Sequence, residues 1–236
     1  MLSQTTAALL VGGLGTRLRT VVQDRNKVLA EIDGRPFLTY LLDQLADAGI
    51  THAVLCTGYK GELVQEVLGP RYKNIDLEYS QEPEPLGTGG ALALARPMLR
   101  SDPVLVMNGD SYCHVDFPKF AEFYQSRQAS AALVLVEVAD ARRFGSVRSD
   151  ANDRIVSFEE KDSARSHAWI NGGIYLIGQT WLSKIQGTRA ISLERDVFPT
   201  WLGREFFGFR SPGPFIDIGT PESLAAAAAV FTAKTE

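Results

Sequence analysis

Residues 9–18 read Leu9-Leu10-Val11-Gly12-Gly13-Leu14-Gly15-Thr16-Arg17-Leu18. The apolar run that leads into this stretch, residues 7–11, predicts a buried strand. Because glycine has no Cβ, a loop with three glycines lets backbone N–H groups come close to phosphate oxygens. The guanidinium of Arg17 also suits phosphate. A plain turn between a strand and a helix needs only one glycine, so the stretch favours a phosphate-binding loop in an α/β domain.

The spacing of this loop excludes two common nucleotide-binding motifs. A dinucleotide-binding fingerprint needs a third glycine or an alanine three residues after Gly15, where the chain has Leu18, and an acidic residue ending the second strand. A P-loop needs a Gly-Lys-Ser/Thr sequence, which the loop also lacks. The loop is therefore expected to bind phosphate in another way.

Composition limits the function classes further. The 236 residues fit one large domain, and a net charge of −4 gives no support to nucleic-acid binding. No apolar run approaches the roughly 20 residues of a membrane span, and we expect no signal peptide. The only cysteines, Cys56 and Cys113, indicate a reduced, cytoplasmic protein without a zinc site.

Strand-like and helix-like patterns alternate through the first half of the chain. The expected strands cover residues 7–11, 52–57, 75–79, 104–107 and 131–138, and the expected helices cover residues 36–48, 61–68, 89–99 and 117–125. The second half is more irregular: we expect short strands at 145–148, 155–159 and 169–177, helices at 193–201 and 221–231, and an irregular to extended segment at 206–218. This order predicts a Rossmann-like mixed, mostly parallel sheet flanked by helices, within a single domain spanning residues 1–236.

Two carboxylates stand at the ends of expected strands. Asp110 lies in Asn108-Gly109-Asp110, at the carboxyl end of a strand, where ligands of open α/β sheets bind. Asp217 occupies a similar place in Phe215-Ile216-Asp217-Ile218. Carboxylates there could hold Mg²⁺, which prefers oxygen ligands. The alternatives are a helix-capping role for Asp110 and an ordinary turn role for Asp217.

Several motifs, taken in their order, resemble those of the sugar-1-phosphate nucleotidylyltransferases, also called NDP-sugar pyrophosphorylases. The motifs are Gly12-Gly13-Leu14-Gly15-Thr16-Arg17-Leu18, Lys27, Pro85-Leu86-Gly87-Thr88-Gly89-Gly90, Asn108-Gly109-Asp110, Glu160-Lys161, Asn171-Gly172-Gly173 and Asp217-Ile218-Gly219-Thr220-Pro221. The stretch from Tyr79 to Gly90 is most similar to the D-glycero-D-manno-heptose 1-phosphate guanylyltransferase branch. Mannose-1-phosphate guanylyltransferases and N-acetylmuramate-1-phosphate uridylyltransferases remain alternatives.

The resemblance implies a fold of the nucleotide-diphospho-sugar transferase type. Residues of about 1–138 would form the nucleotide-binding core, and residues of about 139–236 a smaller sugar-binding lobe with closing elements. No acyltransferase β-helix is expected after residue 231. The protein would be a monomer or a homodimer that acts on small molecules, in assembly of a lipopolysaccharide or capsule precursor.

The resemblance also implies roles for individual residues. Catalysis would involve Arg17, Lys27 and Asp110; nucleotide binding would involve Leu10, Gly12, Gly13, Gly15, Thr16, Arg17, Lys27, Glu82, Gly87, Thr88 and Gly109; sugar-phosphate binding would involve Gly145, Glu160, Lys161, Asn171 and Gly172; and Asp110 and Asp217 would bind Mg²⁺. A sugar 1-phosphate oxygen would attack the α-phosphorus of a nucleoside triphosphate, and pyrophosphate would leave in line. The carboxylate of Glu82 could accept from both N1–H and N2–H₂ of guanine, which favours GTP.

One departure from the family pattern concerns Lys27. The family lysine usually stands between two prolines, whereas this chain has Asn26-Lys27-Val28. Loss of the prolines predicts a less rigid loop around the lysine. The alternative hypothesis from another functional class is a non-catalytic regulatory subunit that binds a nucleotide sugar. Such a protein would be expected to lose metal or phosphate ligands, whereas this chain keeps Arg17, Lys27, Asp110, Lys161 and Asp217. A dehydrogenase is a third hypothesis. It would be excluded if GTP and Mg²⁺ shift the thermal stability of the protein and NAD(H) does not.

Overall fold

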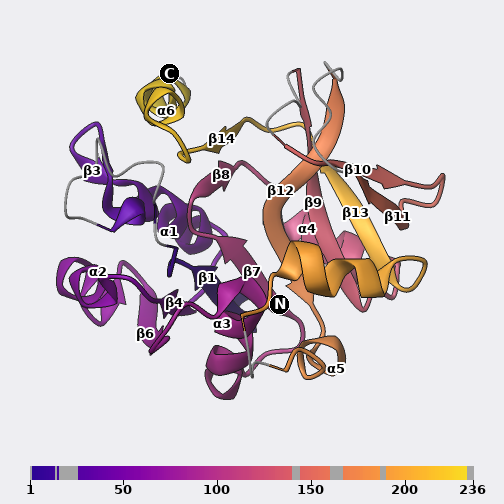
Figure 1. Cartoon of the computed structure of the whole chain (residues 1–236), viewed down its shortest axis with the longest axis horizontal. Coiled ribbons are helices and arrows are strands. Elements are labelled where there is room, and N and C mark those ends of the chain that lie inside the picture. Colours follow the sequence, from indigo (N-terminus) through magenta and orange to yellow (C-terminus); the bar gives the residue numbers. More distant parts are fainter. Residues whose placement is uncertain are drawn as a thin grey trace.

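A computed structural model describes residues 2–13, 15, 26–139, 144–159, 167–186 and 190–232 of the chain. A mixed sheet of ten strands forms its centre (Figure 1). The strands of this sheet are β1 (Thr6–Leu10), β4 (His52–Thr57), β5 (Arg71–Tyr72), β6 (Ile75–Gln81), β7 (Val104–Asn108), β9 (Ala131–Val138), β10 (Ser146–Ser149), β11 (Ile155–Glu159), β12 (Ala168–Ile177) and β13 (Phe206–Ser211).

The strand order is β11-β10-β12-β7-β1-β4-β6-β5, with β9 paired to both β12 and β13. Strands β6, β4, β1 and β7 are parallel neighbours, so their carboxyl ends reach the same edge of the sheet. β12 runs antiparallel to β7 and to β9. The parallel half of the sheet is therefore the half in which a ligand site at the carboxyl ends is expected.

Two small ribbons and a set of helices complete the fold. The ribbons pair β2 (Glu31–Ile32) with β3 (Arg35–Pro36), and β8 (Ser111–Cys113) with β14 (Phe215–Asp217). The α-helices are α1 (Phe37–Asp47), α2 (Gly61–Leu68), α3 (Gly87–Ala95), α4 (Phe117–Ser126), α5 (Gln179–Leu182) and α6 (Pro221–Thr232). Shorter helical segments are η1 (Leu2–Gln4), η3 (Lys27–Leu29), η4 (Arg96–Met98), η5 (Leu193–Val197) and η6 (Phe198–Trp201).

The sheet separates two hydrophobic clusters, because alternate side chains of a strand point to opposite faces. In β1, Ala7 and Leu9 join the cluster that contains side chains of α1, α2, α4 and α6. Ala8 joins the cluster formed with α3, α5, η5 and η6. The molecule thus has three layers, with helices on both faces of the sheet.

The C-terminal helix α6 packs back onto the first half of the chain. The ring of Phe231 stacks on Tyr40 of α1 at 4.0 Å between centroids and meets Tyr112 of β8 edge-on at 4.8 Å. β14, which precedes α6, pairs with β8. This packing draws Asp217, the last residue of β14, to the end of β7.

The predicted fold class is confirmed, with local differences. The helix expected at 193–201 is a π-helical turn followed by a 3-10 turn, because Pro199 lies in the first turn of η6 and lacks the N–H that a continuous helix needs. The helix expected at 89–99 begins at Gly87 and passes into a 3-10 turn at Arg96. The segment 206–218 contains β13 and β14.

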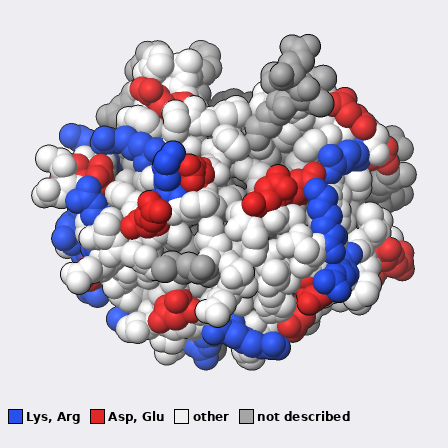
Figure 2. All heavy atoms as spheres, turned by 180° about the vertical axis from the view of Figure 1, so that it is seen from behind, with Lys and Arg blue, Asp and Glu red and all other residues white. Residues whose placement is uncertain are grey.

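Two properties of the whole fold bear on possible partners. Among the described residues, no helix has the length and apolar character needed to cross a membrane. On the face shown in Figure 2, Lys and Arg side chains alternate with Asp and Glu side chains. The described part of that face therefore has no broad basic surface of the kind that binds nucleic acid.

Candidate functional site

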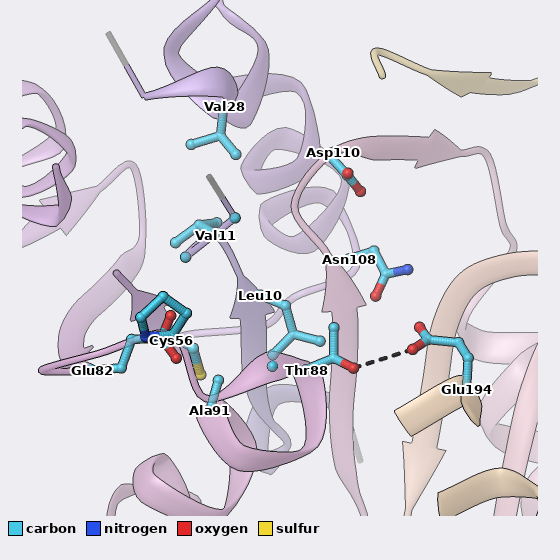
Figure 3. A pocket seen from close by; sticks show the side chains of 14 residues that line it. Leu10, Val11, Val28, Cys56, Glu82, Thr88, Ala91, Asn108, Asp110 and Glu194 are labelled. Atoms are coloured by element: carbon cyan, nitrogen blue, oxygen red, sulfur yellow. Dashed lines mark hydrogen bonds between the residues drawn. The ribbon is translucent and has the colours of Figure 1, made fainter. Parts of the chain in front are cut away.

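A cavity of about 350 Å³ lies at the carboxyl ends of the parallel strands (Figure 3). Its wall contains residues from the end of β1, the glycine loop, β4, the loop after β6, α3, the end of β7 and η5. The lining residues are Leu10, Val11, Gly12, Gly13, Val28, Cys56, Glu82, Pro85, Gly87, Thr88, Ala91, Asn108, Asp110 and Glu194. Many of the residues predicted to bind nucleotide thus line one cavity.

Glu82 occupies one end of this cavity, beside Cys56 (Figure 3). Its Oε2 accepts a hydrogen bond from the N–H of Leu86 at 3.1 Å. Burial raises the pKa of the Glu82 carboxyl, and the Leu86 N–H opposes that rise. The carboxylate is therefore partly desolvated, which strengthens its bond to any donor that a ligand brings.

Two glycines make room for the Glu82 carboxylate. A Cβ at Gly12 would lie 2.9 Å from Glu82 Oε1, and a Cβ at Gly58 would lie 2.5 Å from the same atom. Gly58, in the loop after β4, was not among the predicted site residues. Gly58 belongs to no sequence motif, and only the closeness of its backbone to the Glu82 carboxylate marks it as part of the site.

Gly87 and Thr88 stand at the start of α3 and hold a neighbouring chain segment. Gly87 has a φ of +71°, and a Cβ there would lie 2.5 Å from the carbonyl oxygen of Ile191. Thr88 Oγ1 donates to Glu194 Oε2 at 3.1 Å and accepts from the N–H of Leu193 at 2.8 Å. Glycine at position 87 is thus required by the backbone of the segment that forms the cavity wall.

Glu194 is a charged residue of the cavity that the sequence analysis missed. Besides Thr88, it accepts from Ser192 Oγ at 2.9 Å and from the hydroxyl of Tyr175 at 3.5 Å. Tyr175 is buried, and its pKa is raised well above the ordinary value by burial and then by Glu194. In sequence, Glu194 is one acidic residue in a charged helical run, so no local signal separates it from a solvated surface residue.

Asp110 lines the end of the cavity away from Glu82 (Figure 3), and Lys27 and the backbone of the segment after β14 contact it there. The Nζ of Lys27 lies 2.8 Å from Asp110 Oδ2; the side chain of Lys27 is 9% exposed and that of Asp110 is 45% exposed. The N–H of Ile218 donates to the carbonyl oxygen of Asp110 at 3.0 Å, and Asp217 pairs in register with Ser111. The pairing of β8 with β14 thus brings the backbone of Asp217 close to that of Asp110.

Gly109 allows the Asp110 turn to lie against β1. Its N–H donates to the carbonyl oxygen of Leu10 at 2.9 Å, and a Cβ there would lie 2.6 Å from that oxygen. Any other residue would push Asp110 away from the glycine loop. Gly109 is therefore a structural requirement of the site.

The donor set suits Mg²⁺. Within the part of the chain that the structure describes, no group of three or more His, Cys, Asp or Glu side chains could enclose a metal. Mg²⁺ usually keeps several waters and binds through one or two carboxylates together with substrate phosphates. Between Asp110 and Glu194, the buried Oδ1 of Asn108 has no hydrogen-bond partner among the described residues and could accept from a metal-bound water or a ligand hydroxyl. The carboxylates of Asp110 and Asp217 are thus of the kind that would hold a hydrated Mg²⁺ together with substrate phosphates.

The residues predicted for the sugar phosphate are described only in part. Thr16 and Arg17, predicted for the nucleotide, and Glu160 and Lys161, predicted for the sugar phosphate, lie outside the described residues. Gly145 precedes β10, and Asn171 and Gly172 lie on β12.

β12 brings its predicted sugar residues towards Asn108. A Cβ at Gly173, whose φ is +76°, would lie 3.1 Å from Asn108 Cβ. Asn171 Nδ2 donates to the Tyr175 hydroxyl at 2.9 Å, and its Oδ1 accepts from the N–H of Gly173 at 2.9 Å. A chain of hydrogen bonds through Thr88, Glu194, Tyr175 and Asn171 consequently links the cavity to β12.

The fold and this site define a nucleotidyl transferase, and comparison with known proteins agrees. The profile of the family described as Nucleotidyl transferase matches residues 6–234, so the chain belongs to that family. The family resemblance expected from the sequence is thereby confirmed.

Individual relatives show how similar this chain is to particular members of the family. The chain is 39% identical over 217 residues to the D-glycero-alpha-D-manno-heptose 1-phosphate guanylyltransferase of Aneurinibacillus thermoaerophilus, covering 92% of this chain and 94% of that protein. It is 38% identical over 225 residues to the mannose-1-phosphate guanylyltransferase of Mycobacterium tuberculosis, covering 94% of this chain but 63% of that protein. The crystal structure of HddC from Yersinia pseudotuberculosis complexed with GMP-PN is 33% identical, has a TM-score of 0.85, and is matched over 96% of this chain and 99% of that one.

Proposed function

We propose that the protein transfers the guanylyl group of GTP to D-glycero-D-manno-heptose 1-phosphate, giving GDP-heptose and pyrophosphate in the cytoplasm. The single observation that carries the choice of GTP is the partly desolvated Glu82 carboxylate between Gly12 and Gly58. Guanine presents two adjacent donors, N1–H and N2–H₂, and a carboxylate can accept both. Similarity to heptose 1-phosphate guanylyltransferases over nearly their whole length supports the choice of sugar.

In the proposed reaction, an oxygen of the sugar phosphate attacks the α-phosphorus of GTP and forms a new P–O bond. The bond from that phosphorus to the bridging oxygen breaks, and pyrophosphate leaves with the electron pair. Such a displacement needs positioning and charge neutralisation more than covalent chemistry. The side chains of Asp110 and Asp217 would hold Mg²⁺, which supplies positive charge to the phosphate oxygens. Lys27 would contact the same oxygens.

Other groups have supporting roles in this proposal. Residues 1–138 would bind the nucleotide and residues 139–236 the sugar phosphate, with Glu194 reaching across to the nucleotide cavity. On the sequence resemblance, Arg17 would stabilise the leaving pyrophosphate, Lys161 the sugar phosphate, and Glu160 and Asn171 the sugar hydroxyls.

A pyrophosphate-release screen tests this function. Purified protein with Mg²⁺ would be given GTP, ATP, CTP, UTP or dTTP together with heptose, mannose, glucose or N-acetylmuramate 1-phosphate. We expect GTP with heptose 1-phosphate to give the highest kcat/KM, about tenfold or more above the next pair, because a missing hydrogen-bond partner in a buried site costs more than 1.4 kcal/mol. Mannose 1-phosphate as the best acceptor would overturn the sugar, and UTP with N-acetylmuramate 1-phosphate would overturn the base as well.

Mannose 1-phosphate is the second candidate acceptor because the Mycobacterium tuberculosis relative is nearly as similar over the shared region. Both candidates use GTP, so the same base-binding residue serves either reaction. The acceptor arm of the screen separates them.

Glu82→Gln is expected to lower kcat/KM for GTP about 30- to 100-fold, since the amide loses one acceptor and the charge, and a hydrogen bond to a charged group contributes about 1.5–3 kcal/mol. The same change is expected to raise Tm at pH 7. Because the folded-state pKa of Glu82 is raised, the ionised carboxylate costs stability above that pKa, and this cost disappears as pH falls through it. Steady-state kinetics and a melting curve measure the two effects.

The pH profile of the native protein provides a further check on Glu82. Protonation removes the acceptor for guanine, so kcat/KM for GTP should fall on acidification at a higher pH than an ordinary glutamate would cause. Glu84→Gln, two residues away and exposed, is the matched control and should behave like the native chain. Unchanged GTP kinetics in Glu82→Gln would refute the assignment of the base site.

A further inference from the structure

Asn26 is the most deeply buried polar side chain among the described residues, with 0% exposure. It immediately precedes η3, which begins at Lys27. Its Nδ2 donates to the carbonyl oxygens of Tyr59 at 2.8 Å and Val11 at 3.4 Å, and its Oδ1 accepts from the N–H of Val28 at 3.2 Å. All of its amide atoms are therefore used within the protein.

The partners of Asn26 belong to separate parts of the nucleotide site. Val11 is the residue at which β1 passes into the glycine loop. Tyr59 follows Gly58, whose missing Cβ leaves space for the Glu82 carboxylate. One side chain thus ties the phosphate loop, the base end of the cavity and the Lys27 turn together.

The Lys27 side chain depends on the position of this turn. Its side chain is 9% exposed and passes close to Gly15, where a Cβ would lie 3.1 Å from Lys27 Cβ. Its Nζ reaches Asp110 Oδ2 at 2.8 Å. Because a long side chain amplifies a small rotation of its own backbone, the ammonium stays in place only if the turn at Asn26 is fixed.

We propose that Asn26 is a positioning residue for Lys27: its side-chain hydrogen bonds fix the backbone of the turn from which Lys27 extends. A proline at this position would fix the same backbone through its ring. The backbone of Asn26 has φ −67° and ψ 137°. Proline locks φ at about −65°, so the same conformation can be fixed in either way. The hydrogen bonds of Asn26 would thereby offset the loss of loop rigidity that the missing prolines predict. This inference rests on the proposed function, since the role of Lys27 comes from it.

Comparing Asn26→Ala with Asn26→Pro separates positioning from stability. Both variants lose the bonds to Val11, Tyr59 and Val28, so both should melt several degrees below the native protein. In Asn26→Ala the turn is free, and kcat should fall about 10- to 100-fold with KM for GTP within about twofold, since small misplacements of a catalytic group act on the rate. In Asn26→Pro the φ angle is held, and kcat should stay within about threefold of native.

Kinetics are measured well below both melting temperatures, with Val64→Ala, a core substitution in α2, as a control for stability loss. Equal kcat losses in Asn26→Ala and Asn26→Pro would overturn the proposal, and so would an unchanged kcat in Asn26→Ala. If Asn26→Ala does not fold, Asn26→Ser takes its place in the same comparison. Failure of the proposed function is distinct, because the native protein itself would then release no pyrophosphate from GTP.

Discussion

Asp110→Asn is expected to lower kcat for pyrophosphate release about 1,000-fold, because loss of the metal-holding carboxylate removes several kcal/mol of charge stabilisation and each 1.36 kcal/mol is tenfold in rate. The physical basis is the position of Asp110 at the end of β7, beside Asp217 and 2.8 Å from Lys27. The fold should survive, since the Asp110 side chain is 45% exposed and its backbone bond from Ile218 does not involve the carboxylate. Circular dichroism and a pyrophosphate assay over a range of Mg²⁺ concentrations measure both outcomes.

Asp116→Asn is the matched control for this substitution. Asp116 lies six residues further along and caps α4 by accepting from the N–H of Lys119 at 3.0 Å. Asparagine caps helices as well as aspartate does, so this variant should keep both stability and activity. Full activity in Asp110→Asn would remove the metal assignment, whereas equal losses in both variants would point to a general effect of surface charge.

The parts of the fold that follow from the sequence are those determined by local patterns. The strand at 52–57, the helix at 61–68 and the strand at 131–138 have the same bounds in the structure as expected. Each has a strong apolar pattern and a glycine or polar boundary, so local interactions and burial agree on its ends. The buried face of α1 follows from its periodicity in the same way.

Elements held by distant contacts could not be predicted. β8 and β14 have only three residues each, too few for a periodic pattern, and exist because α6 folds back onto α1 and Tyr112. Their pairing nevertheless places Asp217 near Asp110. The sequence thus indicated both carboxylates from their strand-end positions, while their proximity comes from tertiary packing.

The same distinction applies to the site. Residues in sequence motifs, such as Gly12, Thr88 and Asp110, were predicted and line one cavity. Gly58 and Glu194 were missed because their contacts bridge segments far apart in the chain. The sequence marked Asn26 only as a departure from a family pattern, and its burial and hydrogen bonds are the basis of the positioning role proposed above.

Lys27→Met is expected to lower kcat about 100- to 1,000-fold, the loss typical when one preorganised group that faces developing charge is removed. Methionine keeps the apolar stem that lies against Gly15, so packing changes little. Asp110 loses its ion-pair partner but remains 45% exposed to water, and Tm should therefore stay close to the native value. Lys27→Arg, which keeps the charge but changes its shape, should retain more activity than Lys27→Met.

Metal binding gives a second readout for Lys27 that does not depend on turnover. The Lys27 ammonium lies 2.8 Å from the oxygen of Asp110 proposed to hold the metal, so the two cations compete for one carboxylate. Removing the ammonium should tighten Mn²⁺ binding by the free protein, measured by electron paramagnetic resonance, while kcat falls. Weaker Mn²⁺ binding in Lys27→Met would show that the metal lies elsewhere. A kcat within threefold of native would show that Lys27 does not contact the reacting phosphates, because a positive charge at that place cannot be lost without raising the barrier.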